Sequence, residues 1–396
     1  MFFQPLDKKQ DCRLFYYNND LHENLPDNPT YTWKYVDYVS GVPGVKFAQL
    51  LCAGQDLNAV CPESLRGDLE RTTRKLKSYL KSFHISKVNL DDVCFFDLTP
   101  ESFLLDYFDV RNEITKHVVD NYEEPKNYKF LADLSGLSEQ IRTSKLNIQP
   151  DNIAHKLGNY QARQFMRKIN NSKNVIDYNI FGTITGRLAT NPGSFPIMTL
   201  NHKFRSVLVP NNDLFVELDY NAAELRVFLA LLGIPQPTGD IHTWIAKNVF
   251  KGALSRDAVK KKVFAWLYNP QARNSKLESI FNKNKILEKY YDGESVRTVY
   301  GRTIKADLHH ALNYIIQSTT SDLFLRQVIE TNKIFKDKKS YISFSIHDSF
   351  VIDASKDDIE LVKQATGCFS ATPFGHFKSN LSIGKDFGNM VNIDTI

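Results

Sequence analysis

Two β-rich segments that lie far apart in the chain each lead to an aspartate, and this pairing constrains the fold more than any other feature. Residues 214–218 read Leu-Phe-Val-Glu-Leu and run into Asp219. Residues 342–352 contain two β-rich runs around a short polar turn with His347 and Asp348, which predicts a hairpin with Asp348 near its tip. Placed side by side, the two strand ends would hold two divalent cations about 3.5–4 Å apart. The sequence therefore predicts neighbouring strands with a two-metal site at one end.

A helix is predicted directly after the first aspartate, over residues 222–232, with Asn221 as its expected N-cap. The main chain of Tyr220 and Asn221 would then lie beside a triphosphate bound to the metal ions. Taken alone, Asp219 could equally be a residue that only caps this helix. That alternative does not account for the second aspartate.

A cationic helix is predicted between the two aspartates, over residues 256–268. Ser255 is a good N-cap, and Pro270 stands just past the expected end. Residues four apart lie on one slowly turning stripe of a helix. The stripe here consists of Arg256, Lys260, Phe264 and Tyr268. The two cationic side chains could bind the phosphates of a nucleoside triphosphate, and the two rings could stack on its base or sugar. Lys260 could also protonate the leaving pyrophosphate. On its own, such a helix is more often a solvated surface.

Composition sets wider bounds on the class of protein. The 396 residues are 42% hydrophobic and 12% aromatic, enough for a large core in two or three subdomains. The formal net charge of +5 is a mild bias toward nucleic acid that many unrelated enzymes share. The five cysteines form no CxxC pair, so we expect reduced thiols, no structural zinc and a cytoplasmic protein. No long apolar segment or signal-peptide pattern is present, and no membrane partner is expected.

The order of the predicted elements indicates an α+β protein with its helices first. Residues 62–84 are helical and basic and include Arg74 and Lys77, which fits either a solvated face or a helix along a phosphate backbone. Residues 99–170 continue as mostly helical. Strand signals cluster later, at 214–218, 296–300 and 342–346. Residues 1–60 carry no readable pattern.

These motifs, in this order, resemble those of the family A DNA polymerases, the bacterial DNA polymerase I family that includes many phage replicases. Residues 219–226 resemble motif A, residues 256–268 motif B, and His347-Asp348 motif C. The resemblance extends over roughly residues 180–390. Its further matches are Thr185-Gly186-Arg187-Leu188, Gly301-Arg302, Asn313 with Gln317, and Ile383-Gly384-Lys385.

The resemblance implies a right-hand fold and a set of residue roles. Asp219 and Asp348 would bind two Mg²⁺ ions, which Mn²⁺ could replace, and Lys260 would share in catalysis. The residues expected at the nucleotide are Arg256 and Lys260 on the triphosphate, Phe264 on the sugar, Tyr268 under the templating base pair, Tyr220, and Glu224 as the steric gate that favours deoxynucleotides. The residues expected at the DNA are Arg187, Asn313, Gln317, His347, Arg302, Arg74 and Lys77.

The same resemblance divides the chain into the parts of a right hand, with an antiparallel-sheet palm and short helical fingers. The expected parts are an N-terminal segment of unknown role over 1–60, a thumb-like helical region over 61–150, the first part of the palm over 151–235, fingers over 236–300 and the second part of the palm over 301–396. The only early match to a proofreading motif is Asp68-Leu69-Glu70, inside the basic helix. We therefore expect no 3′–5′ exonuclease and no 5′-nuclease in this chain.

Four positions depart from the family pattern. They are Ala265, Asn269, His309 and Ser349, the last standing where the family often has an acidic residue. Single-subunit RNA polymerases also read His-Asp-Ser here, so an RNA polymerase or primer-making enzyme is one alternative, against which Glu224 and Phe264 argue. A polymerase-like binding subunit with weak catalysis is another. Primer-template DNA and dNTPs are the expected ligands, and the resemblance leaves room for a helicase, primase or processivity factor. A compact polymerase of this kind suggests a phage or mobile element, hence the host cytoplasm.

Overall fold

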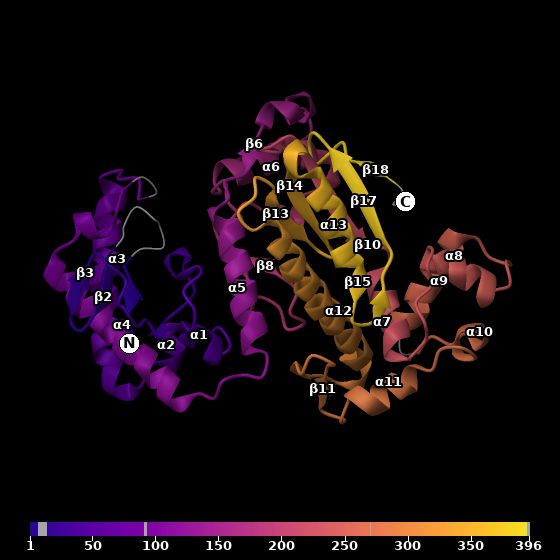
Figure 1. The fold of residues 1–396 in the computed structure, drawn as a ribbon, viewed down its shortest axis with the longest axis horizontal. Helices are drawn as coiled ribbons and strands as arrows, with labels where there is room; N and C mark the ends of the chain where they lie inside the picture. The colour runs from indigo at the N-terminus through magenta and orange to yellow at the C-terminus, as the bar shows by residue number, and fades with distance from the viewer. Residues whose placement is uncertain (7–13, 91–92, 270, 394–396) are drawn as a thin grey trace. The chain divides into compact units, whose positions relative to one another are not determined.

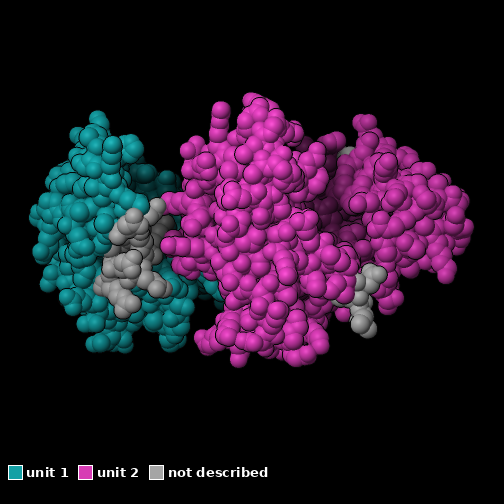
Figure 2. All heavy atoms as spheres, turned by 90° about the horizontal axis from the view of Figure 1, so that it is seen from above, with its two compact units in different colours: residues 1–140 teal, residues 141–396 magenta. Residues whose placement is uncertain are grey.

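The computed structural model describes residues 1–6, 14–90, 93–269 and 271–393. These residues form two compact units, 1–140 and 141–396, which are coloured separately in Figure 2. The boundary falls within helix α5 (Tyr128–Thr143). It lies ten residues before the boundary expected at residue 150.

Unit 1 is built around two long helices, α3 (Glu63–Ile85) and α4 (Glu101–Asn121). Its other elements are β1 (Gln4–Pro5), β2 (Phe15–Tyr17), β3 (Asp20–His22), β4 (Tyr31–Thr32), β5 (Lys46–Phe47), α1 (Ala48–Leu51) and α2 (Leu57–Val60). The N-terminal segment is integral to this unit, because the Gln4 side chain donates hydrogen bonds to Asn112 at 3.3 Å and Thr115 at 2.9 Å on α4. The boundary expected at residue 60 therefore does not separate two units.

Unit 2 contains a five-stranded antiparallel sheet in the order β13-β14-β10-β17-β18 (Figure 1). Its strands are β10 (Leu214–Tyr220), β13 (Tyr341–Ile346), β14 (Ser349–Ala354), β17 (Ser379–Gly384) and β18 (Val391–Ile393). The predicted hairpin is thus β13-β14, and the first aspartate's strand β10 is its direct neighbour. The expectation that the two strands lie side by side is confirmed.

Two helices, α12 (Leu308–Asn332) and α13 (Ile359–Ser370), pack against this sheet (Figure 1). Phe369 of α13 is the centre of the contact. Its ring lies 3.9 Å from the ring of Tyr220 on β10, 5.0 Å from Phe350 on β14 and 6.0 Å from Phe324 on α12. All four rings are almost completely buried. This aromatic cluster fixes the strands that carry the two aspartates.

The segment between β10 and α12 forms a helical cluster with a core of its own. Its elements are α7 (Ala223–Leu231), α8 (Ile241–Asn248), α9 (Arg256–Tyr268), α10 (Ser275–Glu278), α11 (Lys283–Tyr290), β11 (Ser295–Arg297) and β12 (Thr303–Lys305). Phe228, Trp266 and Phe281 meet in this core with ring centroids 5.8–6.2 Å apart. The strand predicted over 296–300 ends at Arg297, because the chain then turns through Gly301, whose φ is +81°.

The remaining elements of unit 2 are short. They are β6 (Asn147–Ile148), α6 (Tyr160–Asn170), β7 (Tyr178–Asn179), β8 (Ala189–Thr190), β9 (Leu208–Val209), β15 (Ala371–Thr372) and β16 (Gly375–His376). Short 3₁₀ helices in the two units cover Asp37–Val39, Phe96–Leu98, Pro150–Lys156, Ile197–Thr199, His202–Val207, Lys333–Phe335 and Lys356–Asp358. In the described part of the chain, no helix is both long enough and apolar enough to span a bilayer.

The expectation of five reduced thiols is wrong for one cysteine. Cys52, Cys61 and Cys368 are free thiols, whereas Cys94 is disulfide-bonded. Cys12 lies outside the described residues. The spacing of cysteines along the sequence does not report which of them meet in the fold, and this is why the sequence pattern misled.

Candidate active site

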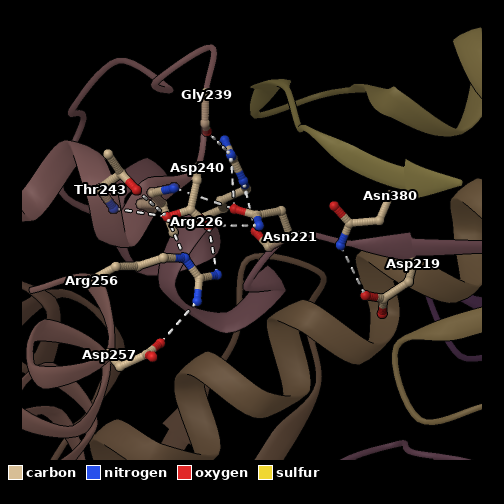
Figure 3. Close-up of polar contacts among 10 residues, drawn as sticks. Asp219, Asn221, Arg226, Gly239, Asp240, Thr243, Arg256, Asp257 and Asn380 are labelled. Atoms are coloured by element: carbon tan, nitrogen blue, oxygen red, sulfur yellow. Dashed lines mark hydrogen bonds and ion pairs between the residues drawn. The ribbon is translucent and has the colours of Figure 1, made fainter. Parts of the chain in front are cut away.

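Asp219, on β10, and Asp348, in the turn directly before β14, lie at one end of the sheet. Asp219 stands directly opposite Ser349 of β14 and Asn380 of β17. Asn380 donates a hydrogen bond of 3.4 Å to the Asp219 carboxylate (Figure 3). Asp348 precedes Ser349, so the two aspartates are neighbours across the β10-β14 pair.

The electrostatics of this pair favour a bound cation. Burial, joined by the charges of Glu217 and Asp348, raises the pKa of Asp219 to about 7 against the effect of Asn380. Burial also raises the pKa of Asp348, which the nearby Arg187 partly offsets. Both carboxylates therefore lack enough positive charge nearby to keep them comfortably ionised. Such a pair is typical of a functional site.

The turn of the hairpin places Asp348 at the tip, as predicted. His347 adopts a left-handed conformation with φ of +54° and is exposed, a conformation that non-glycine residues rarely adopt outside turns. His347 and Arg187 line the same small cavity of about 20 Å³. Two of the residues expected at the DNA are therefore gathered beside Asp348.

The donor atoms at this end of the sheet suit magnesium, a hard cation that prefers carboxylate oxygens. Among the described residues, no three His, Cys, Asp or Glu side chains converge closely enough to form a complete protein cage for an ion. Magnesium is commonly held by one or two carboxylates while water and substrate phosphates complete its shell. Asp219 and Asp348 fit that pattern.

Glu224, on the first turn of α7, connects three separate segments. Its carboxylate accepts hydrogen bonds from the Arg187 guanidinium and from the Tyr268 hydroxyl on α9. The Glu224 side chain is only 14% exposed. Burial, together with the Glu224 charge, raises the pKa of Tyr268 far above its usual value, and the charge of Asp348 adds to this. The network therefore brings Arg187, Glu224 and Tyr268 together within electrostatic reach of Asp348.

Helix α9 has the predicted bounds. Its N-cap Ser255 accepts a hydrogen bond of 3.3 Å from the Ala258 N–H, while Pro270 lies outside the described residues. Phe264 and Tyr268 stack with ring centroids 5.9 Å apart and an interplanar angle of 18°. Lys260 is exposed. The predicted stripe is thus a continuous surface of the helix.

Arg256, at the start of the stripe, is bound to an aspartate that the sequence analysis missed. Its guanidinium donates to both carboxylate oxygens of Asp240, at 3.1 Å and 2.8 Å (Figure 3). Asp240 also caps α8 by accepting from the Thr243 N–H at 2.8 Å and binds Asn221 at 3.1 Å. Although burial acts to raise it, these hydrogen bonds hold the pKa of Asp240 well below its usual range.

Arg226, inside motif A, is completely buried. Its guanidinium donates to the main-chain oxygens of Asn221 at 2.8 Å and Gly239 at 2.7 Å (Figure 3). It also donates to the main-chain oxygen of Pro237 at 2.9 Å. Burial lowers its pKa to about 10. Arg226 therefore ties the end of β10 to the loop that presents Asp240.

The expected N-cap role of Asn221 is wrong. Ala222 takes the N-cap position of α7 in a left-handed conformation with φ of +54°. This turn directs the Asn221 amide to Asp240 and to the N–H of Ile241 instead. A long-range partner thus replaces the local capping bond that the sequence suggested.

His242 is a second residue that the sequence analysis missed. It is 2% exposed, and its ring lies 5.9 Å from that of Phe264 on the stripe. Burial lowers its pKa despite the charge of Asp240, and Arg256 and Lys260 add to the lowering. Its Nδ1 has no hydrogen-bond partner within the described part of the chain. The sequence offers Asp240 as an N-cap and so indicates a helix that contains His242. It does not indicate that His242 lies close to α9.

Of three residues expected to contact nucleotide or DNA, two have clear structural partners and the third has an unpartnered atom. The Tyr220 ring is buried and its hydroxyl donates to the Phe369 oxygen at 2.6 Å, so only the Tyr220 main chain is available to a nucleotide. Arg302 forms an ion pair with Asp322 of α12 at 2.7 Å. Asn313 has a buried Oδ1 without a partner among the described residues.

The other expected DNA contacts lie on helices. Gln317 is half-buried on α12, one turn after Asn313. Arg74 and Lys77 are exposed on α3 in unit 1. Arg71 of the same helix is instead paired with Asp68 and Asp106. Arg74 and Lys77 are therefore accessible cations on the basic helix.

Comparisons with known proteins agree with the motifs. A DNA polymerase from Bacillus phage SP01 is 25% identical over 280 residues, which covers 54% of this chain and 28% of that protein. The chain thus spans little more than a quarter of that relative's length. The polymerase domain of Pol1 from M. smegmatis, solved with DNA primer-template and dNTP, aligns with a TM-score of 0.54 and 13% identity, over 76% of this chain and 79% of that domain. No protein-family model matches the chain.

These comparisons confirm two of the predictions from sequence. The structural alignment confirms the α+β polymerase-domain fold. Together with the phage relative, it confirms the resemblance to the polymerase domain of a phage-type family A DNA polymerase.

Proposed function

We propose that this chain is a template-directed DNA polymerase, which attaches deoxynucleotides to a primer 3′-hydroxyl and releases pyrophosphate. One observation carries the proposal: Asp219 on β10 and Asp348 in the turn before β14 are neighbours at one end of the sheet, and Glu224 links that end to the α9 stripe. Paired carboxylates facing a cationic helix match the demands of nucleotidyl transfer.

The proposed metal site consists of Asp219 and Asp348, holding two Mg²⁺ ions that Mn²⁺ can replace. When bound, such ions stabilise the attacking and leaving oxygens of an in-line displacement. Lys260 would bind the triphosphate and give a proton to the departing pyrophosphate. Phe264 would stack on the incoming sugar, and Tyr268 would lie under the templating base pair.

Arg256 would reach the triphosphate by changing partners. Its guanidinium is now held by Asp240 through two hydrogen bonds. A triphosphate offers the same guanidinium a more highly charged bidentate acceptor. Binding would therefore exchange one ion pair for another, with little of the desolvation cost that a free arginine would incur.

Glu224 is proposed to exclude ribonucleotides, because its carboxylate, held by Arg187 and Tyr268, lies within electrostatic reach of Asp348, where the sugar must pass. In Glu224→Ala we expect the preference for dNTP over NTP, measured as the ratio of kcat/KM values, to fall roughly 10–200-fold. The control Glu224→Gln keeps the side chain's size and should keep most of the preference. A wild-type chain that extends primers equally well with NTPs would instead indicate an RNA polymerase or primer-making enzyme.

The exposed cations of α3 are proposed to bind duplex phosphates. Association of the chain with primer-template DNA should then weaken linearly on a log–log plot against salt concentration. Replacing Arg74 and Lys77 with alanine should reduce the slope by about 1.8, since each lost phosphate contact removes about 0.9. Lys129→Ala, which removes an exposed lysine paired with Asp133, is the control. An unchanged slope in the double variant would exclude α3 as the duplex contact.

The remaining expectations extend this proposal. We propose that the chain carries no proofreading or 5′-nuclease activity, works in the cytoplasm of a host cell, and meets replisome proteins such as a helicase, primase or processivity factor. The second candidate function is a polymerase-like binding subunit. The Ser349 departure favours it, because Ser349 leaves motif C with a single carboxylate.

A further inference from the structure

Glu217 is a third carboxylate on the strand and face that carry Asp219. Alternate residues of a strand point to the same face. On β10, the half-buried Glu217 and Asp219 alternate with the fully buried Val216, Leu218 and Tyr220. The buried set forms the core side of the sheet, so Glu217 and Asp219 both project from the other side.

Ser349 directs the Glu217 carboxylate toward the strand of Asp348. The Ser349 hydroxyl donates a hydrogen bond of 2.9 Å to Glu217 Oε1. Ser349 stands directly opposite Asp219 and follows Asp348 in the chain. The hydrogen bond thus holds Glu217 diagonally across the β10-β14 pair, within electrostatic reach of Asp219.

Among the described residues Glu217 has no ion-pair partner, and its carboxylate accepts a hydrogen bond from the neutral Ser349 hydroxyl. A partly buried carboxylate close to that of Asp219 is stabilised by a bound cation. The three side chains do not converge into a complete cage, so Glu217 is too far for direct coordination of an ion shared by all three.

We propose that Glu217 is the third carboxylate of the metal site, acting through water on the ion held by Asp219, with Ser349 orienting it. The inference rests on the proposed function, because it takes Asp219 and Asp348 as ligands. Its function is to raise the affinity for the ion. It also accounts for Ser349, which stands where the family often has an acidic residue. In this chain the third carboxylate would come from Glu217 on β10 instead of from position 349.

Direct metal binding tests this assignment. Free Mn²⁺ would be titrated against the chain and followed by electron paramagnetic resonance, without DNA or nucleotide. Glu217→Gln should weaken Mn²⁺ binding about tenfold, the lower end of the loss found when outer-shell ligand partners are removed. The matched control is Glu360→Gln, an exposed glutamate on α13 paired with Lys363, which should bind as wild type. Equal affinities for Glu217→Gln and wild type would overturn the proposal.

A double variant that moves the carboxylate from position 217 to position 349 tests whether the charge, and not the local packing, strengthens Mn²⁺ binding. Because position 349 faces Asp219 directly, the double variant E217S/S349E keeps a serine–glutamate pair across the two strands with its direction reversed. It should recover most of the Mn²⁺ affinity that Glu217→Ser alone loses. Thermal unfolding of each variant shows whether it is folded. A folded double variant that binds no better than Glu217→Ser would contradict the charge-based role.

The two proposals fail in different ways. Mn²⁺ binding that depends on Glu217, in a chain that never extends a primer, would refute the polymerase assignment and leave the carboxylate assignment standing. Primer extension by wild type, with Mn²⁺ affinity unchanged in Glu217→Gln, would refute only the role of Glu217. In an active chain, Glu217→Gln should also raise the Mg²⁺ concentration needed for half-maximal extension.

Discussion

Asp348→Asn should abolish primer extension, lowering the single-turnover rate by about 10³-fold or more, the scale on which loss of one electrostatic group acts in a buried site. The substitution keeps the size of the side chain and removes the charge proposed to hold a metal ion. Asp219→Asn should have an effect of the same order, because the neighbouring strand supplies the other ligand. The rates would be measured by rapid quench with a labelled primer, dNTPs and Mg²⁺.

The control for this experiment is an aspartate next to the start of β10, the strand whose other end carries Asp219. Asp213 immediately precedes β10 and accepts a hydrogen bond of 2.8 Å from the Lys356 N–H. Asp213→Asn removes one carboxylate charge from the same sheet, away from Asp219, and should extend primers at close to the wild-type rate. Wild-type extension by Asp348→Asn would exclude the proposed metal site. A matching loss in Asp213→Asn would assign the effect to the fold instead.

Arg226→Met should destabilise unit 2 by about 3–5 kcal/mol, because removal of a buried guanidinium leaves its buried oxygen partners unsatisfied. Three main-chain oxygens and the Asn221 amide lose their donor. The resulting fall in Tm is roughly 6–20 °C for a unit of this size. Differential scanning calorimetry of the whole chain would measure it.

Arg163→Met provides the comparison for that measurement. Arg163, on α6, also donates to two main-chain oxygens, those of Leu157 and Gly158 at 2.8 Å, but it is exposed. Water can replace its hydrogen bonds, so the change in stability should stay within about 0.5 kcal/mol. If Arg226→Met melted at the wild-type temperature, the claim that Arg226 holds the Asp240 loop in place would be refuted.

Sequence patterns predicted those elements whose signals are local. The capping serine and the four-residue stripe gave the bounds of α9, and period-two alternation around a polar turn gave the β13-β14 hairpin. In residues 1–60 the strands are only two or three residues long. A strand that short shows no periodicity, so the small sheet of unit 1 could not be recognised.

The parts of the site that depend on long-range contacts were less accessible to prediction. Asp240 is a plain helix cap in sequence, and only the fold brings it to Arg256. From the sequence alone Arg302 would be taken for an unpaired cation, and only the fold brings it to Asp322 on α12. Glu217 was the most readable of the missed residues, because it stands two positions before Asp219 on a strand and so must share its face.

The most direct test of the central claim is incorporation of a single nucleotide on four primer-templates that differ only in the next template base. Each dNTP would be offered alone, with Mg²⁺, and the primer product resolved by length. A template-directed DNA polymerase adds only the dNTP complementary to each template base, and the product pattern follows the template across all four substrates. Failure to extend any primer, or addition of the same nucleotide whatever the template base, would contradict the account.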